Sequence, residues 1–304
     1  MTRKKVVTLN MSWEANNWGN AGPANPRLSD EQWRQVANSW NPSLYAYDTT
    51  KQNVFGPAYM NALRNIRNVQ PDIILLQEFQ IPTLVDDADR NRNEATVALI
   101  DVLNRNTKKY TVAAINMDVF TAQPAVACLV IVSGYTTATD ISVDCRHAVN
   151  GISRAIYQLA PFEGGRPLAA AILEDGQGKT LIISSHSDHG VPWNHEVFSQ
   201  TVLVTLFSTF SALDVSRTPQ LIWGGDFNRE LNVANATFND RNVFAHKASN
   251  PTIHSKTQQV DWIMTTRVNP ALVIEPLALI TVASDHMLGV TTTSTYFGVP
   301  NRCN

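Results

Sequence analysis

An ordered series of carboxylate, amide and imidazole side chains runs through this sequence, each at or near the end of a short apolar run. In chain order they are Asn10, Glu78, His186, Asp226, Asn228, Asp261, Asp285 and His286. Apolar runs bounded by Gly, Ser, Asn and Asp are typical of buried strands, so the series predicts side chains gathered where strands leave the core. Oxygen and imidazole donors, almost without thiols, favour a hard divalent cation with acid–base help. That combination suits the hydrolysis of phosphate esters.

Three of these residues offer oxygen ligands from separate predicted strands. Glu78 follows Ile-Ile-Leu-Leu-Gln, where an unpaired charge would be costly to bury, so a compensating partner is expected. Together with Asn10 and Asp285, it predicts one Mg²⁺ or Mn²⁺ site that keeps several waters. For Glu78 taken alone, the alternative is a carboxylate at the surface end of a strand.

Asp261 and His286 predict a carboxylate-supported imidazole, in which the acid fixes the tautomer of the ring and raises its basicity. A histidine with a purely structural role is the alternative for His286 alone. Asp226 and Asn228 follow two glycines, Gly224-Gly225, which allow close approach of another backbone. Of these side chains, Asp226, Asp261 and His286 can take part in acid–base chemistry, whereas the Asn228 amide can only donate or accept hydrogen bonds.

Taken in order, the short motifs around these residues resemble those of the endonuclease/exonuclease/phosphatase superfamily. That group includes DNase I-like nucleases, abasic-site endonucleases, inositol-phosphate 5-phosphatases and neutral sphingomyelinases. The resemblance extends from about residue 6 to about residue 292 and rests on seven motifs in the same order. They are Leu9-Asn10, Leu76-Gln77-Glu78, Arg166-Pro167, Ser185-His186, Gly225-Asp226-Phe227-Asn228, Val260-Asp261-Trp262-Ile263 and Ser284-Asp285-His286.

The resemblance implies a role for each metal-directed and phosphate-directed residue. Glu78 is implied to be the principal metal ligand, assisted by Asn10 and Asp285. His186 matches the histidine that contacts the scissile phosphate, as an acid or as an electrostatic clamp. Arg166 matches the arginine that pairs with phosphate, a task that suits the guanidinium fork; a solvated surface arginine is its alternative.

For the attacking water, the resemblance implies Asp226, Asn228 and the Asp261–His286 pair. Asp226 and Asn228 would orient that water and bind a phosphate oxygen. The general base is left open between Asp226 and His286.

The spread of the motifs over the chain, without a repeat or a linker, predicts one large domain, residues 1–304, with an aromatic-rich insertion at about 11–56. The expected strands cover 5–10, 73–76, 110–115, 127–133, 168–173, 180–184, 221–223, 271–274, 277–283 and 288–293, and the expected helices 58–69, 94–104 and 198–213. Strands with intervening helices suit the architecture that the resemblance implies, a four-layer α/β sandwich of two packed mixed sheets flanked by helices.

Charge and composition limit the partners. With 24 Lys and Arg against 26 Asp and Glu, the formal charge is −2, so no global positive field draws the protein to a polyanion. Three cysteines argue against a disulfide framework, and no apolar stretch reaches the length of a membrane span. These features predict a soluble, intracellular protein; secretion through a leader not present in this sequence is the alternative. The oligomeric state is left open.

The sequence therefore predicts a divalent-metal-dependent phosphoesterase. Within that class, it favours a DNase I-like endonuclease that acts on nucleic acid with little sequence preference. The alternative substrate is a small or lipid phosphoester, such as an inositol phosphate, a nucleotide signal or sphingomyelin. A catalytically inactive binding module with the same fold is the alternative from another class.

Overall fold

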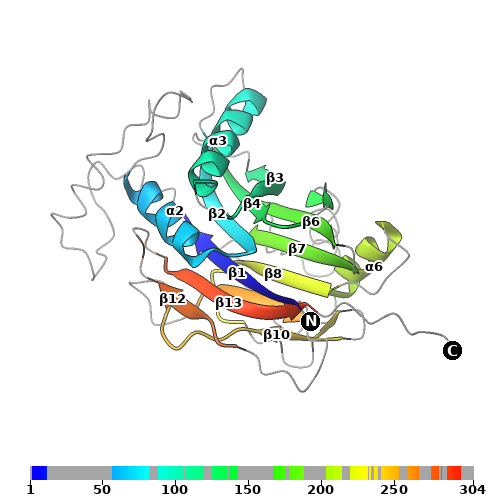
Figure 1. The fold of residues 1–304 in the computed structure, drawn as a ribbon. Coiled ribbons are helices and arrows are strands. Elements are labelled where there is room, and N and C mark those ends of the chain that lie inside the picture. The colour runs from blue at the N-terminus through cyan, green and yellow to red at the C-terminus, as the bar shows by residue number, and fades with distance from the viewer. Residues whose placement is uncertain are drawn as a thin grey trace.

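The structure is a computed structural model. It describes residues 2–11, 57–81, 88–105, 107–118, 125–135, 137–142, 167–175, 178–187, 203–213, 220–231, 233, 236–238, 241–252, 259–266, 275–280, 282 and 286–295. Two β-sheets lie at its centre (Figure 1). Each sheet contains both parallel and antiparallel pairs of strands, so both sheets are mixed.

The six-stranded sheet has the order β12-β13-β1-β2-β4-β3. Its strands are β1 (Thr2–Asn10), β2 (Ile73–Ile81), β3 (Thr111–Asp118), β4 (Ala125–Val132), β12 (Ala278–Ile280) and β13 (Leu288–Thr295). The seven-stranded sheet has the order β5-β6-β7-β8-β11-β10-β9. Its strands are β5 (Thr137–Asp140), β6 (Leu168–Asp175), β7 (Gly178–His186), β8 (Gln220–Asp226), β9 (Thr237–Phe238), β10 (Arg241–Ala245) and β11 (Asp261–Thr266).

Residues on opposite faces of each central strand enter different hydrophobic clusters, because successive side chains of a strand point to opposite faces. In β2, Ile73 and Leu75 join the cluster between the two sheets, whereas Ile74 and Leu76 join the cluster on the outer face. In the same way, Ile222 of β8 lies between the sheets, and its neighbours Leu221 and Trp223 lie outside. Burial on both faces explains why these strands are almost continuously apolar.

Helices cover both outer faces. The apolar residues of α2 (Pro57–Val69) and α3 (Ala88–Leu103) pack on the six-stranded sheet, and those of α6 (Leu203–Leu213) pack on the seven-stranded sheet. The predicted four-layer α/β sandwich is confirmed. Every helix in the described ranges is too short or too polar to cross a membrane.

Several predicted boundaries differ from the observed ones. Helix α3 begins at Ala88, six residues before the predicted start, since its first turns are polar and lack the apolar spacing that predicts an amphipathic helix. Strand β2 continues past its predicted end to Ile81. The predicted strand at 271–274, the start of the predicted helix at 198–202 and the insertion from residue 12 to residue 56 lie outside the described residues. The single domain stays a prediction.

Candidate active site

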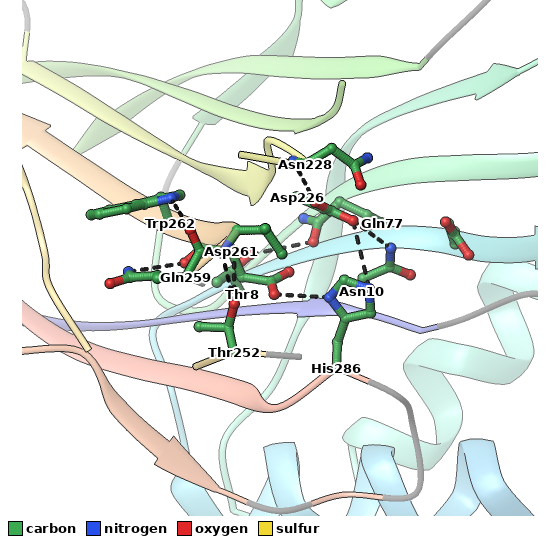
Figure 2. A network of polar contacts seen from close by, with 12 residues as sticks. Thr8, Asn10, Gln77, Asp226, Asn228, Thr252, Gln259, Asp261, Trp262 and His286 are labelled. Atoms are coloured by element: carbon green, nitrogen blue, oxygen red, sulfur yellow. Dashed lines mark hydrogen bonds and ion pairs between the residues drawn. The ribbon is translucent and has the colours of Figure 1, made fainter. Parts of the chain in front are cut away.

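The predicted site residues that the structure describes lie together, and Figure 2 shows five of them beside one another: Asn10, Asp226, Asn228, Asp261 and His286. A continuous set of contacts joins them: Asn10 to Asp226, Asp226 to both histidines, His286 to Asp261, and His186 to Glu78 and Asn228. Two predicted residues, Arg166 and Asp285, lie outside the described residues, so their placement stays a prediction.

Strand alternation explains why these side chains meet. Along the inner face of β1, the sequence passes from Val6 through Thr8 to Asn10, so an apolar position is followed by a polar one and then by a site residue. Strand β7 follows the same order through Ile182 and Ser184 to His186, whereas in β8 a glycine, Gly224, stands between Ile222 and Asp226. His186 and Asp226 are paired in the parallel ladder. Since Asp226 is also paired with Asp261 of β11, three site residues lie in a row across one sheet end.

Glu78 reaches the site by a different route. By alternation it would point outward with Ile74 and Leu76, away from the other site residues. A register shift between Leu76 and Phe79 interrupts the pairing of β2 with β4, and the φ angle of Glu78 is +50°. This bulge leaves Phe79 in the outer cluster and brings the Glu78 carboxylate to within 3.4 Å of His186 Nε2. Glu78 therefore lies within a strand, at a bulge, and not at a strand end as predicted.

Asp226 is the centre of the contacts. Its Oδ2 accepts a hydrogen bond from Asn10 Nδ2 at 3.0 Å and lies 3.6 Å from His286 Nε2 and 3.7 Å from His186 Nε2. Its Oδ1 accepts a hydrogen bond from the backbone N–H of Asn228 at 2.7 Å. Asn228 has a φ angle of +54°, a conformation that asparagine tolerates in tight turns. The carboxylate is thereby held in one orientation while Oδ2 faces both histidines.

The predicted Asp261–His286 pair is present at hydrogen-bonding distance. His286 Nδ1 lies 2.8 Å from Asp261 Oδ2, and both side chains are buried. Because an ionised carboxylate only accepts, Nδ1 is the protonated nitrogen, and Nε2 is the one that faces Asp226. The ring is thus fixed in tautomer and in direction, as the sequence predicts.

His186 lies between two carboxylates and an amide. Its Nε2 is 3.4 Å from Glu78 Oε1 and 3.3 Å from Asn228 Nδ2, and its side chain is almost fully buried. The amide of Asn228 also donates to the backbone oxygen of Ser187 at 2.8 Å. The last residues of β7 and the turn after β8 therefore form one unit around His186.

The donor set fits a divalent cation. Three carboxylates, those of Glu78, Asp226 and Asp261, lie in or beside this buried cluster, and the ion pairs recorded for them within the described part of the chain are with histidines. Asp261 Oδ1 is buried and, among the described residues, has no hydrogen-bond partner. Ligand atoms of Asp226, Asp261 and His286 also lie within 4.8 Å of one another. Excess negative charge with an unsatisfied oxygen is the environment that a hard cation stabilises.

Polar residues behind the site were not singled out from the sequence. Gln77 donates to Ser184 Oγ at 2.9 Å and Ser184 donates to the backbone oxygen of Leu76 at 2.8 Å, so the two sheets are joined by hydrogen bonds directly below the site. Both interrupt apolar runs at inward-facing positions, which is the signal that could have identified them. Thr252 carries no such signal, since it follows Pro251 outside any strand.

Comparison with known proteins supports the fold. No protein-family model matches the chain, and no curated protein matches its sequence. Among solved structures, an endonuclease/exonuclease/phosphatase family protein from Leptotrichia buccalis is 13% identical, with a TM-score of 0.51 over 96% of this chain and 100% of that one. The catalytic domain of human Nocturnin, solved with a bound sulfate anion, is 14% identical, with a TM-score of 0.51 over 95% and 93%.

A third solved structure, an endonuclease/exonuclease/phosphatase from Beutenbergia cavernae, is 14% identical, with a TM-score of 0.50 over 96% of this chain and 71% of that one. Identities this low show the fold alone. The resemblance stated from the motifs and the arrangement of the two sheets agree with each other. The chain therefore has the DNase I-like fold of the endonuclease/exonuclease/phosphatase superfamily.

Proposed function

We propose that this chain is a divalent-metal-dependent phosphoesterase, and specifically an endonuclease that hydrolyses nucleic-acid phosphodiester bonds with little sequence preference. One observation carries the proposal. His186 and His286 direct their Nε2 atoms at the same oxygen of Asp226, at 3.7 and 3.6 Å, within a cluster of carboxylates that fits a cation. Such a site provides acid–base groups on two sides of a carboxylate, as in-line attack on a phosphate ester requires.

Glu78, Asn10 and Asp285 are the residues proposed to hold Mg²⁺ or Mn²⁺. The Glu78 carboxylate lies at the mouth of the cluster with 13% of its side chain exposed, whereas Asp226 and Asp261 are 2% and 0% exposed. When bound, the cation would polarise the phosphoryl oxygens and neutralise the charge that develops on them. Asp226, Asp261 and His286 offer a second group of donor atoms.

The attacking water is proposed to lie against Asp226 and His286. Their facing atoms, Oδ2 and Nε2, are 3.6 Å apart, which is too far for a direct hydrogen bond but allows one water molecule to contact both. Asp261 holds His286 Nδ1 and stabilises a proton acquired by the ring. Asn10 and the backbone of Asn228 hold Asp226 in place. The proton of the water is therefore accepted by either Asp226 or His286, and neighbouring residues hold both side chains in place.

His186, Asn228 and Arg166 are proposed to bind the scissile phosphate. His186 Nε2 and Asn228 Nδ2 are 3.3 Å apart and come from adjacent strand ends, so both can contact one phosphate group. Phosphate contacts carry no sequence information directly, and the sequence offers no recognisable base-reading module, which supports cleavage with little sequence preference.

A small phosphoester is the second candidate substrate, and the formal charge of −2 favours it. Few ion pairs with a nucleic-acid backbone are then expected, so binding to DNA should be modest and its dependence on salt shallow. An inactive binding module is the less favoured function, because the predicted site residues that the structure describes are joined by a continuous set of contacts.

A substrate panel tests the proposal. Supercoiled plasmid, single-stranded DNA, RNA, inositol phosphates and short nucleotides are each incubated with the protein and Mg²⁺, with Asp226→Asn as the negative control. The expected result is conversion of plasmid to nicked and linear forms. Intact plasmid beside turnover of a small phosphoester would replace the endonuclease by the phosphatase alternative. No turnover of any substrate would contradict the phosphoesterase itself.

Metal dependence has its own test. We expect excess chelator to abolish turnover and Glu78→Gln to remove most of it, because the carboxylate is proposed as the principal ligand. Added Mg²⁺ should raise the melting temperature of the original protein, as a ligand of the folded state does, and leave that of Glu78→Gln nearly unchanged. Full activity in excess chelator, or an equal thermal response in both proteins, would contradict this part of the proposal.

A further inference from the structure

Thr252 connects the two halves of the Asp261–His286 pair through hydrogen bonds to backbone groups. It lies outside any strand and is fully buried, and no motif of the sequence includes it. Its hydroxyl oxygen accepts hydrogen bonds from the backbone N–H groups of Val260 and Asp261, both at 3.0 Å. Its own backbone oxygen accepts one from the N–H of Met287 at 2.8 Å. Figure 2 shows Thr252 directly beside Asp261.

The start of β11 needs these hydrogen bonds because its neighbouring strand does not reach it. The pairing of β10 with β11 ends at Ala245–Met264, three residues before Asp261. A buried N–H group without a partner is costly, and the Thr252 hydroxyl oxygen has two lone pairs, which match the two N–H groups. The threonine thus completes the edge of the sheet where β10 is too short.

The same residue links this edge to the segment that carries His286. Met287 directly follows His286, and its N–H is held by the carbonyl of Thr252. One residue therefore sets the position of the Asp261 backbone from one side and of the His286 backbone from the other. Their side chains meet at 2.8 Å, a distance that small backbone shifts would lengthen.

We propose that Thr252 is a positioning residue that keeps Asp261 and His286 at hydrogen-bonding distance. The proposal rests on the proposed function in that His286 acts in catalysis through the same pair. Loss of the hydroxyl should lower turnover roughly 10-fold to 100-fold, with little change in KM. Substitutions of residues that orient metal-ligating side chains have effects of this size.

Four variants test this role. Thr252→Val keeps the shape and removes the acceptor, and Thr252→Ser keeps the acceptor. Thr266→Val is the matched control, because Thr266 is also buried and its hydroxyl accepts one backbone N–H, that of Leu221 at 3.0 Å. It lies at the other end of β11 from Asp261. Thr252→Val is also combined with Asp261→Asn. We expect a turnover loss in Thr252→Val, none in Thr252→Ser or Thr266→Val, and no further loss in the combined variant relative to Asp261→Asn.

A spectroscopic readout does not depend on activity. The proton on His286 Nδ1, which is buried and bonded to a carboxylate, should give a downfield NMR signal that is absent in His286→Gln. We expect this signal in the original protein, in Thr252→Ser and in Thr266→Val, and its loss or fast exchange with water in Thr252→Val. If Thr252→Val does not fold, Thr252→Cys takes its place, since a thiol is a weak acceptor of similar size.

The outcomes separate the two proposals. Retention of the signal and of turnover in the variant without an acceptor would overturn the positioning role and leave the proposed function intact. Multiplied effects of Thr252→Val and Asp261→Asn would also overturn it, since they would show independent action. If no phosphoester is cleaved, the proposed function fails, and the NMR signal still decides whether Thr252 holds the pair.

Discussion

The side chain of Asp226 contacts four groups of the site. Both of its oxygens are engaged, one by the backbone of Asn228 and the other by Asn10, and two imidazoles lie within 3.7 Å of the second oxygen. Asp261 differs, since one oxygen is bonded to His286 and the other is buried without a partner among the described residues. The two aspartates are therefore suited to different tasks, one toward the reacting groups and the other toward the imidazole.

At this scale we predict that Asp261 and His286 act as a unit. His286→Ala and Asp261→Asn should each lower kcat by roughly 10² because both disable the same imidazole. The kcat of the double variant should be no lower than that of the less active single variant. Steady-state kinetics on the cleaved substrate provide the measurement. Asp72→Asn is the control, since that carboxylate binds Lys108 Nζ and the Lys5 backbone where β2 begins, whereas Glu78 lies near the other end of the strand. Losses that multiply would contradict a shared role.

At the scale of the element, two local irregularities bring the site residues inward. The bulge in β2 turns Glu78 from the outer face to the inner one. In β8, Gly225 allows the backbone of β7 to come close: a Cβ atom added there would lie 1.9 Å from the backbone oxygen of Ser185. The predicted close backbone approach is confirmed at Gly225; at Gly224 the nearest atom to an added Cβ is a side-chain carbon of Leu75, at 2.6 Å. The bulge lies at Glu78 itself, and Gly225 directly precedes Asp226.

We predict that Gly225→Ala destabilises the protein by roughly 3 kcal/mol, at the upper end of the range for overpacking, because backbone must move to make room. The displaced residue is Ser185, so His186 should shift and turnover should fall as well. Gly134→Ala is the matched control: its added Cβ meets no atom within 4 Å, and its φ angle of +79° costs roughly 1–2 kcal/mol in strain alone. Urea unfolding of both variants is the measurement. An equal loss in the two would contradict the steric account.

At the scale of the whole molecule, buried polar residues join the two sheets. His246 is bonded to Thr265 of β11 in one sheet, to Thr291 of β13 in the other, and to the backbone oxygen of Glu275. Burial lowers the pKa of His246 below its ordinary value of 6.5, although the hydrogen bond to Glu275 and the charge of that residue act in the opposite direction. The neutral ring satisfies these contacts, with Nδ1 donating to the Glu275 oxygen.

This arrangement predicts a loss of stability in acid. Above pH 6.5 the ring is neutral in both states and contributes no pH dependence; as the pH falls below 6.5, the unfolded chain takes up the proton first, so the free energy of unfolding falls. Urea unfolding at about pH 7.5 and about pH 5.5, on either side of the histidine range, measures the effect. His246→Gln should lose less stability between the two values. An equal loss in both proteins would assign the acid sensitivity to other groups.

The motifs in the sequence predicted the fold class through their resemblance to a known superfamily, and most of the residues they single out lie close together in the candidate site. Period-two alternation ends several strands with a polar residue on the inner face, so Asn10, His186 and Asp226 could be assigned to strand ends from local pattern alone. The pairing of Asp261 with His286 was also predicted correctly. The local pattern succeeds here because every second side chain of a strand points to the same face of the sheet.

Only the tertiary structure decided features that depend on neighbouring strands. The bulge at Glu78 follows from how β2 pairs with β4, and Thr252 becomes a partner of Asp261 only because β10 ends before the start of β11. Neither fact leaves a mark in the residues concerned. Alternation along a strand is set by its own backbone, whereas register, strand length and unpaired N–H groups are set by contacts between segments distant in sequence, and these are fixed only when the sheets assemble.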